Sequence, residues 1–343
     1  MTNLTQLIGV RPLALYCAVA SLGVLLSACA KIELPAHLRP ISNDSLMLLG
    51  AKRMSQQHPI FIRIFKEESE FEVWKQRADG RFYHFKTYPI CTWSGKLGPK
   101  KTLGDKQAPE GFYAVNRHRM NPNSKYHLSF NLGYPNAFDR ANGRTGRFLM
   151  VHGKCSSAGC YAMTDGLMEE IYALAREAFI GGQSKFHVHA FPFRMTDANL
   201  ERHRYSENYR FWKRLKQGYD YFELTRMTPK IAVCDRQYFV NVDWQGDKPD
   251  PAGACPTFRR PELKPFWPAL GEEQMATQRM AVQGVKRRNR RLAQSKPIDR
   301  TLMSGLTRVA DEGRSHVLRT SATSRPDMIG LLIRLTQPMR PGD

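Results

Sequence analysis

The sequence lacks three features that would each assign it to a particular class of protein. Its apolar run near the N-terminus, residues 12–26, is shorter than the roughly 20 residues that a membrane-spanning helix needs. No internal repeat stands out. No spaced pair of cysteines or histidines resembles a known zinc pattern, so His187 and His189 are interpreted as surface or near-site residues of a strand. We expect neither a metal nor an organic cofactor.

The residues around position 29 indicate export. The apolar run has the length of a signal-peptide core, and it ends in Leu26-Ser27-Ala28-Cys29. This segment resembles the lipobox of bacterial lipoproteins, in which the cysteine is acylated. We therefore expect a signal peptide over residues 1–28, lipidation of Cys29 and a periplasm-facing protein held to the membrane by its lipid. Ala30 favours the outer membrane. Ordinary secretion, with cleavage near Ala28 or Ala30, is the alternative.

Acidic residues are scarce relative to basic ones. The chain has 31 Asp and Glu residues against 52 Lys and Arg residues, a formal net charge of +21. Such a balance suits an anionic partner such as nucleic acid, lipid headgroups or acidic wall polymer. Because export is expected, nucleic acid is the partner that we exclude. The basic block at residues 286–291 lies in a segment, 265–343, that we expect to be a largely disordered or loosely helical tail.

Cysteines are also few. Of the seven, Cys17 falls in the expected signal peptide and Cys29 is assigned to the lipid, which leaves five. An odd number in an oxidising compartment means that at least one thiol stays free or reactive. We expect Cys234 and Cys255 to close a loop as a disulfide. Cys155 is interpreted as a small loop residue, and the alternative is that it pairs with Cys160 under oxidation.

Short β-branched and aromatic runs dominate residues 58–225. They predict strands at 60–66, 71–74, 83–88, 112–115, 126–132, 148–152 and 186–191. One amphipathic helix is indicated from Thr164 or Asp165 to Gly181, and a more polar one over 199–216. The pattern predicts a mostly-β or α+β domain. A lead-in linker, 29–57, precedes this domain, and a small strand-like extension, 226–264, follows it.

The segment from 148 to 165 carries the chemistry. An apolar strand ends at His152-Gly153, and a loop of small residues then leads through Gly159 to Cys160 at the start of the expected helix. A helix N-terminus and a protonated imidazole both lower a cysteine pKa. Gly159 lets the backbone approach a substrate, and the amides around Cys160 could face a developing oxyanion. His152 could take the thiol proton and return it to a leaving amine, so the pattern favours acyl transfer.

These motifs resemble those of the YkuD-type L,D-transpeptidases, and more closely their YafK-like branch. The resemblance covers roughly residues 58–225. It rests on His152-Gly153 with Ser157-Ala158-Gly159-Cys160, and on further blocks at 91–100, 104–112, 133–141 and 191–199. It implies a YkuD-like β-sandwich with a packed helix. Cys160 would be the nucleophile, His152 the base, and Ser157 and Gly159 loop residues before the nucleophile.

The resemblance also implies a substrate. Cys160 would attack a peptidoglycan stem peptide at the L-centre of diaminopimelate and form a thioester, which an amine would resolve. Hydrolysis of the same thioester, including release of a wall-attached lipoprotein, is the alternative. A non-catalytic wall-binding lipoprotein is a third interpretation. Trp93, Tyr134 and Arg194 are candidates for the substrate groove. Ala158 and Ala162 stand where the broader family usually has His and Arg, which weakens the inference that the acceptor is the usual stem amine.

Overall fold

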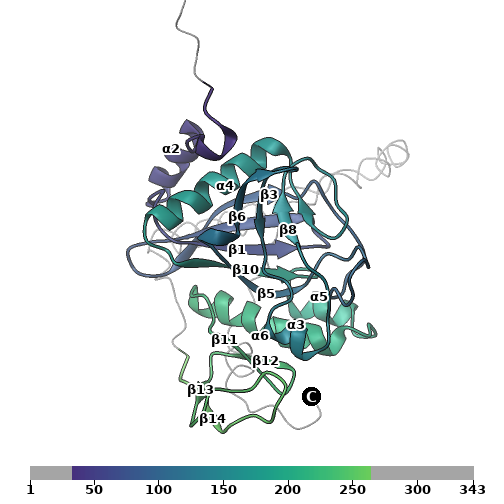
Figure 1. The fold of residues 1–343 in the computed structure, drawn as a ribbon. Coiled ribbons are helices and arrows are strands. Elements are labelled where there is room, and N and C mark those ends of the chain that lie inside the picture. The colour runs from purple at the N-terminus through teal and green to yellow at the C-terminus, as the bar shows by residue number, and fades with distance from the viewer. Residues whose placement is uncertain (1–32, 264–343) are drawn as a thin grey trace, which may run out of the picture.

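The computed structural model describes residues 33–263. The expected signal peptide, the expected lipidation site Cys29 and the expected tail from 265 lie outside these residues. Within them, two five-stranded sheets face each other and helices flank the pair (Figure 1). This arrangement confirms the predicted α+β class. Among the described residues, no helix is long and apolar enough to cross a membrane.

The first sheet has the strand order β3-β2-β1-β10-β5. Its central strand, β1, pairs antiparallel with β2 and parallel with β10. Every residue of β1 is buried, because one face lines the core and the other is covered by a helix. The strands are β1 (Ile60–Phe65), β2 (Glu70–Gln76), β3 (Phe82–Pro89), β5 (Gly111–Asn116) and β10 (Lys185–Phe191).

The second sheet has the order β4-β9-β8-β7-β6 and contains shorter strands. Its strands are β4 (Thr92–Trp93), β6 (Met120–Ser124), β7 (His127–Asn131), β8 (Met150–His152) and β9 (Tyr161–Ala162). The strand expected from residue 148 begins only at Met150. Phe148 has a φ of 57° and is 65% exposed, so it turns away from the sheet before pairing starts. Strands β8 and β9 run parallel to each other.

Helix α4 (Asp165–Ile180) closes one side of the sandwich. Its apolar face, which includes Ile171, Leu174 and Ala178, is fully buried in the core that the two sheets share. The amphipathic pattern predicted this helix and its end at Gly181, which is the C-cap residue. A Cβ atom at Gly181 would lie 2.1 Å from the Gln57 carbonyl oxygen, so the helix can end against that segment only with glycine here.

Two helices replace the single helix expected over 199–216. They are α5 (Asp197–Arg202) and α6 (Tyr209–Thr225), and the prediction was wrong because no glycine or proline marks the break between them. Helix α6 packs its aromatic side chains on the outer face of the first sheet, where Phe222 lies 4.6 Å from Phe61 between ring centroids. The buried Arg63 joins the two layers through Glu72 and Glu223, at 2.8 and 2.6 Å.

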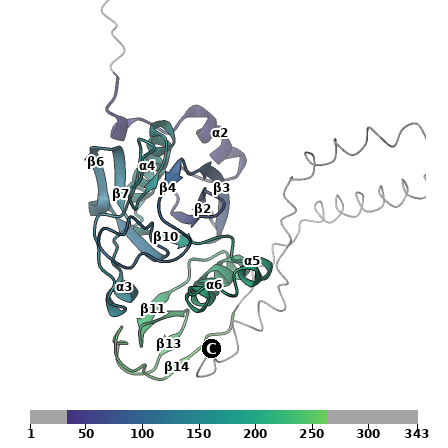
Figure 2. The same cartoon turned by 90° about the vertical axis from the view of Figure 1, so that its right-hand side faces the viewer.

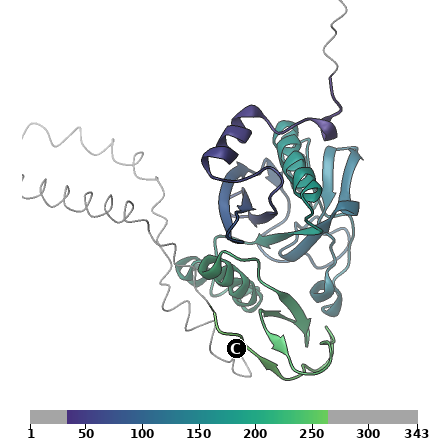
Figure 3. The same ribbon diagram turned by 90° about the vertical axis from the view of Figure 1, so that its left-hand side faces the viewer.

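Smaller elements lie at the two ends of the molecule. The segment expected to be a linker contains η1 (Ala36–Leu38) and α2 (Asn43–Ala51), and α2 lies beside α4 (Figures 2 and 3). At the opposite end, the extension forms two hairpins. They are built from β11 (Ile231–Cys234), β12 (Gln237–Val240), β13 (Asp243–Trp244) and β14 (Phe258–Arg259). The remaining elements are η2 (Arg117–Arg119) and α3 (Ala137–Ala141).

Candidate active site

The candidate base ends β8 of the second sheet, and the candidate nucleophile directly precedes β9, the parallel strand beside it. Val151 pairs with Tyr161, and His152 pairs with Ala162. Val151 and Tyr161 are fully buried between the sheets, so the alternate residues project from the outer face. Cys160 directly precedes Tyr161 and His152 directly follows Val151. The strand pairing therefore brings both side chains to the same outer face, on adjacent strands.

Cys160 is the single cysteine outside a disulfide among residues 33–263. Its Sγ accepts a hydrogen bond from the Met150 amide at 3.4 Å and donates to the Phe148 carbonyl oxygen at 3.7 Å. Burial raises the pKa of the thiol, although the Met150 amide and the charge of Lys100 oppose this rise. At neutral pH the resting group is therefore the thiol, and a base is needed to make it nucleophilic.

His152 is oriented by the residue that follows it. Its Nδ1 lies 2.6 Å from the Gly153 carbonyl oxygen. A carbonyl oxygen can only accept, so Nδ1 carries the proton and Nε2 keeps a free lone pair. Burial lowers the pKa of the imidazole, although the bond to Gly153 opposes this. The ring is thus neutral at pH 7 and is ready to accept a proton at Nε2.

The expectation that Cys160 lies at the start of a helix was wrong. Strand β9 follows Cys160 and pairs with both β8 and β4, and α4 begins only at Asp165. The helix N-terminus therefore does not help to ionise the thiol, which agrees with the raised pKa of Cys160.

Ser157 fixes the turn before the nucleophile. Its Oγ donates to the Cys160 carbonyl oxygen at 2.8 Å and accepts from the Gly159 amide at 3.3 Å. Gly159 has a φ of 122°, a conformation that side-chain-bearing residues rarely adopt. The Ser94 hydroxyl, from the segment after β4, lies 3.1 Å from the Ser157 hydroxyl. The turn is thereby held on both sides.

The start of the loop is anchored to α4. The Lys154 amide donates to Oδ1 of Asp165 at 2.7 Å. A Cβ atom at Gly153 would lie 2.5 Å from the same oxygen, so glycine is needed where the strand leaves the sheet. Gly153 is a predicted site residue, whereas no signal in the sequence marks Asp165 for this role.

A disulfide between Cys91 and Cys155 ties the same loop to the segment before β4. The two Cα atoms lie 5.3 Å apart, and the bridge joins residues separated by 64 positions. Both sequence-based interpretations of Cys155, a plain loop residue and a partner of Cys160, are corrected by this pairing. Spacing alone could not reveal it, because the two cysteines meet only once β4 pairs with β9. The structure also pairs Cys234 with Cys255, the pair that we expected.

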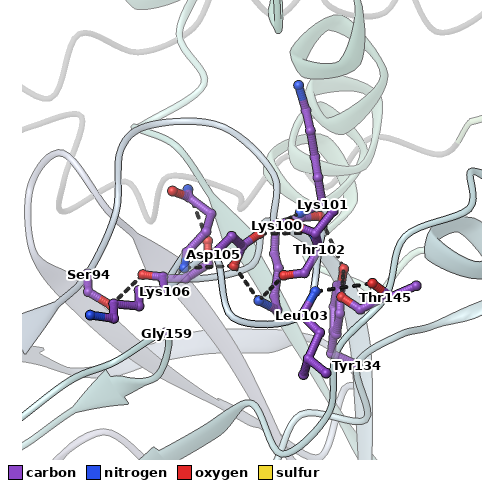
Figure 4. A network of polar contacts seen from close by, with 12 residues as sticks. Ser94, Lys100, Lys101, Thr102, Leu103, Asp105, Lys106, Tyr134, Thr145 and Gly159 are labelled. Carbon is purple, nitrogen blue, oxygen red and sulfur yellow. Dashed lines mark hydrogen bonds and ion pairs between the residues drawn. The ribbon is translucent and has the colours of Figure 1, made fainter.

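A basic loop lies next to Gly159 (Figure 4). The ammonium group of Lys100 is almost entirely buried, pairs with Asp105 and donates to the Thr102 carbonyl oxygen at 2.9 Å. Asp105 also accepts from three backbone amides of the loop, those of Lys101, Thr102 and Gln107. Lys100 brings the positive charge that favours the Cys160 thiolate. Lys100 lies in the segment 91–100 that carries part of the family resemblance, but it was not among the predicted site residues.

The three tentative groove residues occupy different places. Tyr134 supports the basic loop, because its hydroxyl donates to the Lys100 carbonyl oxygen at 3.1 Å. Trp93 pairs with Tyr161 in the sheet and packs against the core. Arg194 lies in the segment between β10 and α5, and it pairs with Glu70 and, at 2.8 Å, with Glu72 of β2. Tyr134 and Trp93 thus adjoin the surroundings of Cys160, whereas Arg194 is tied to the first sheet.

Two further residues adjoin His152 and were not predicted. The ring of Tyr126 lies 4.7 Å from the His152 ring and is half exposed, so it shields the imidazole from one side. Ser129 pairs with His152 across β7 and β8. Its hydroxyl is buried and has no hydrogen-bond partner within the described part of the chain. No local signal marks either residue, since their roles depend on the strand pairing.

The described residues contain no group of three or more His, Cys, Asp and Glu side chains that could hold a metal ion. His187 and His189 lie on the outer face of the first sheet. His189 is fully buried between the rings of Phe61 and Phe112, at 4.7 and 4.6 Å between centroids. The chemistry available on the outer face of the second sheet is therefore that of a thiol, an imidazole and backbone amides.

Comparison with known proteins adds a family. In Escherichia coli K12, “Putative L,D-transpeptidase YafK” is 45% identical over 190 residues, which cover 55% of this chain and 77% of that protein. Pgp2, a helical cell shape determining protein from Campylobacter jejuni, is 22% identical with a TM-score of 0.31, over 45% of this chain and 55% of that one. Bd1075 from Bdellovibrio bacteriovorus is 18% identical with a TM-score of 0.30, over 68% of this chain and 99% of that one. Residues 61–188 match the family model of the L,D-transpeptidase catalytic domain, YkuD. The chain belongs to the YkuD family of L,D-transpeptidase catalytic domains.

Proposed function

We propose that this protein transfers acyl groups on peptidoglycan stem peptides through a thioester on Cys160. One observation carries the proposal. The free thiol of Cys160 shares an outer sheet face with His152, whose Nδ1 proton is held by Gly153 so that Nε2 remains free. Membership of the L,D-transpeptidase family supplies the substrate class. A purely binding protein would need neither the thiol nor the base.

In the first half-reaction, Cys160 attacks the amide carbonyl carbon at the L-centre of diaminopimelate. The thiol proton passes to Nε2 of His152 while the carbon–sulfur bond forms. Backbone amides next to Cys160 stabilise the oxyanion, and Ser157 keeps that turn rigid. The carbon–nitrogen bond then breaks as Nε2 gives its proton to the leaving amine. A thioester remains on Cys160.

In the second half-reaction, an acceptor amine attacks the thioester carbonyl. The acceptor gives a proton to Nε2, the carbon–sulfur bond breaks, and the sulfur recovers the proton as a thiol. Water in place of the amine would make the protein a hydrolase that uses the same intermediate. Lys100 adds a positive charge that favours the Cys160 thiolate. This charge takes the place of the arginine that the broader family usually has at the position of Ala162.

Mass spectrometry of wall fragments after incubation with the purified protein tests this proposal. We expect new cross-links at diaminopimelate with the wild type and with Ser156→Ala, which alters an exposed residue of the same loop. Cys160→Ala should yield none. Shortened stems or released lipoprotein without new cross-links would assign hydrolysis instead. If the wild-type protein is folded and the wall fragments are still unchanged after incubation with it, the catalytic proposal is overturned.

The proposal includes a location. We place the protein in the periplasm, anchored through a lipid on Cys29 with the outer membrane favoured. The two disulfides of the described residues support this, because such bonds persist in oxidising compartments. Cells fed labelled palmitate should label the wild type and leave Cys29→Ser unlabelled and released into the soluble periplasmic fraction. Equal labelling of the two proteins would exclude Cys29 as the acylated residue.

A further inference from the structure

A cavity of about 420 Å³ lies away from Cys160, at the edge of the first sheet. Its floor is formed where β5 and β10 pair, with Ala114 opposite His187. The segment that leads into α3 forms one wall, and β11 with β12 forms another. Neither Cys160 nor His152 lines it, so this cavity is separate from the candidate active site. Its volume falls within the usual range for sites that bind small ligands.

The cavity is cationic. Arg119, Arg140 and Lys185 line it, and none of its lining residues is acidic. Within the described part of the chain, none of these three cations has a carboxylate partner within ion-pairing distance. The buried Arg63, by contrast, is paired with both Glu72 and Glu223. A group of unneutralised cations around a hollow attracts an anion.

One of these cations is held in place before any ligand arrives. Nη1 of Arg119 donates to the carbonyl oxygens of Ala114 and Leu132, at 2.6 and 3.2 Å. A Cβ atom at Gly133 would lie 1.5 Å from that nitrogen, so glycine makes room for the guanidinium. Fixing a binding group in advance reduces the entropy lost on binding.

The remaining lining is suited to an organic ligand. Phe112 and Tyr238 present aromatic surface, and Ile231 and Val233 add aliphatic surface from β11. Burial and the neighbouring Lys185 lower the pKa of His187 to about 4, so at neutral pH this ring offers uncharged donor and acceptor positions. A ligand with carboxylates on a partly apolar body matches this lining better than a bare inorganic anion.

The extension completes the cavity. Strands β11 and β12 lie beyond residues 61–188, which match the family domain, and the Cys234–Cys255 disulfide holds the end of β11. Without Ile231, Val233 and Tyr238 the floor on β5 and β10 would be an open edge. The extension therefore converts the edge of the catalytic domain into a binding site.

We propose that this cavity binds a carboxylate-bearing peptide, namely a stem peptide of the wall polymer, as a second site distinct from the one at Cys160. The identity of the peptide rests on the proposed function. Stem peptides carry several carboxylates on a short chain, which complements cations that approach from η2, α3 and β10. Binding there holds the enzyme on its polymer while Cys160 acts on another stem.

Calorimetric titration of the full mature protein with the tripeptide L-alanyl-γ-D-glutamyl-diaminopimelate tests the proposal. Reversing two exposed charges, with Arg140→Glu/Lys185→Glu, should weaken binding about tenfold or more. Ala114→Leu should weaken it similarly by filling the floor without altering charge. Arg210→Glu/Lys248→Glu, which reverses two exposed charges outside the cavity, should leave the affinity within about twofold. Unfolding temperatures identify any variant that has lost its fold.

Other results would overturn the proposal. Tripeptide affinity that is equal in the wild type, the charge-reversed variant and Ala114→Leu would place binding elsewhere. Inorganic phosphate that binds the cavity while the tripeptide does not would make it a phosphate site. The test is separable from the proposed function, because it needs no turnover. Cavity variants that lose tripeptide binding but still act on a soluble stem peptide would support the second site. A wild-type protein that binds the tripeptide but shows no catalysis would reject the proposed function and leave the second site standing.

Discussion

Burial shifts the pKa values of the candidate nucleophile and the candidate base in opposite directions. It raises the pKa of Cys160 and lowers that of His152, so both are uncharged near neutral pH. The site therefore differs from a preformed thiolate–imidazolium pair. In the reaction that we propose, the thiol becomes nucleophilic only as His152 takes its proton during attack.

Alkylation of Cys160 by iodoacetamide should report this state. Because the thiolate is the reactive form, we expect the rate to keep rising with pH beyond about 8.5, the ordinary pKa of a free thiol. His152→Ala should abolish turnover and leave this profile nearly unchanged. A rate that is already constant below about pH 6 would reveal an ion pair and contradict the assignment. The measurement follows the mass of the labelled protein over time.

Ser157 offers a second test at this scale. Ser157→Ala removes the bonds to the Cys160 carbonyl oxygen and the Gly159 amide. Since such bonds contribute about 0.5–1.5 kcal/mol each, we expect kcat to fall about tenfold with little change in KM. Ser156→Ala makes the same chemical change at an exposed neighbour and should keep full activity. Equal rates for the two variants would mean that the turn does not need Ser157.

Among the elements, the loop from β8 to β9 is held at three places: by Asp165, by Ser94 and by the Cys91–Cys155 bridge. Its two ends are strands of two or three residues. Such short strands provide few backbone hydrogen bonds, so the side-chain contacts and the bridge carry much of the loop's order.

Removal of the bridge should therefore affect both stability and rate. For Cys91→Ala/Cys155→Ala we expect a loss of about 2–4 kcal/mol in the free energy of unfolding and a lower kcat. Cys234→Ala/Cys255→Ala removes the other bridge, in the extension, and should leave kcat on a soluble stem intact. Urea unfolding and steady-state rates measure both effects. An unchanged kcat in the first variant would show that the loop keeps its geometry without the bridge.

Comparison of prediction and structure shows which elements a sequence can reveal. The fold class and α4 could be predicted, because each depends on local hydrophobic periodicity and turn residues. Cys160 and His152 could be proposed because the motif around them is contiguous. Lys100, Tyr126 and Ser129 could not be found in this way, since only strand pairing brings them near the site.

The errors have the same origin. Strand β9 has two residues, too few for a periodic signal. Because β9 was not predicted, Cys160 was expected at the start of the helix, although β9 lies between Cys160 and α4. Arg194 was assigned to the groove from its motif, yet it follows β10 and pairs with Glu70 and Glu72 of β2. Contacts between segments far apart in the chain decided each of these cases.

For the whole molecule, the net charge of +21 suggests how it associates with an anionic wall. We expect the protein to co-sediment with isolated wall sacculi at low salt and to be released as ionic strength rises toward about 1 M, where screening acts over about 3 Å. Cys160→Ala should sediment like the wild type, because charge rather than catalysis drives this association. Retention that does not change with salt would point to a specific, uncharged contact.

The position of β1 has a consequence for how the chain folds. This central strand, residues 60–65, is completed only by pairing with β10, residues 185–191, and by the covering helix α6 that follows. Folds built on such distant contacts have a high contact order and fold slowly. The paired strands β1, β2 and β3 therefore lack the parallel partner of β1 and its covering helix until residue 191 and α6 are available. For the export that we propose, this late completion has a use, because it would keep β1 from folding stably while the chain crosses the membrane.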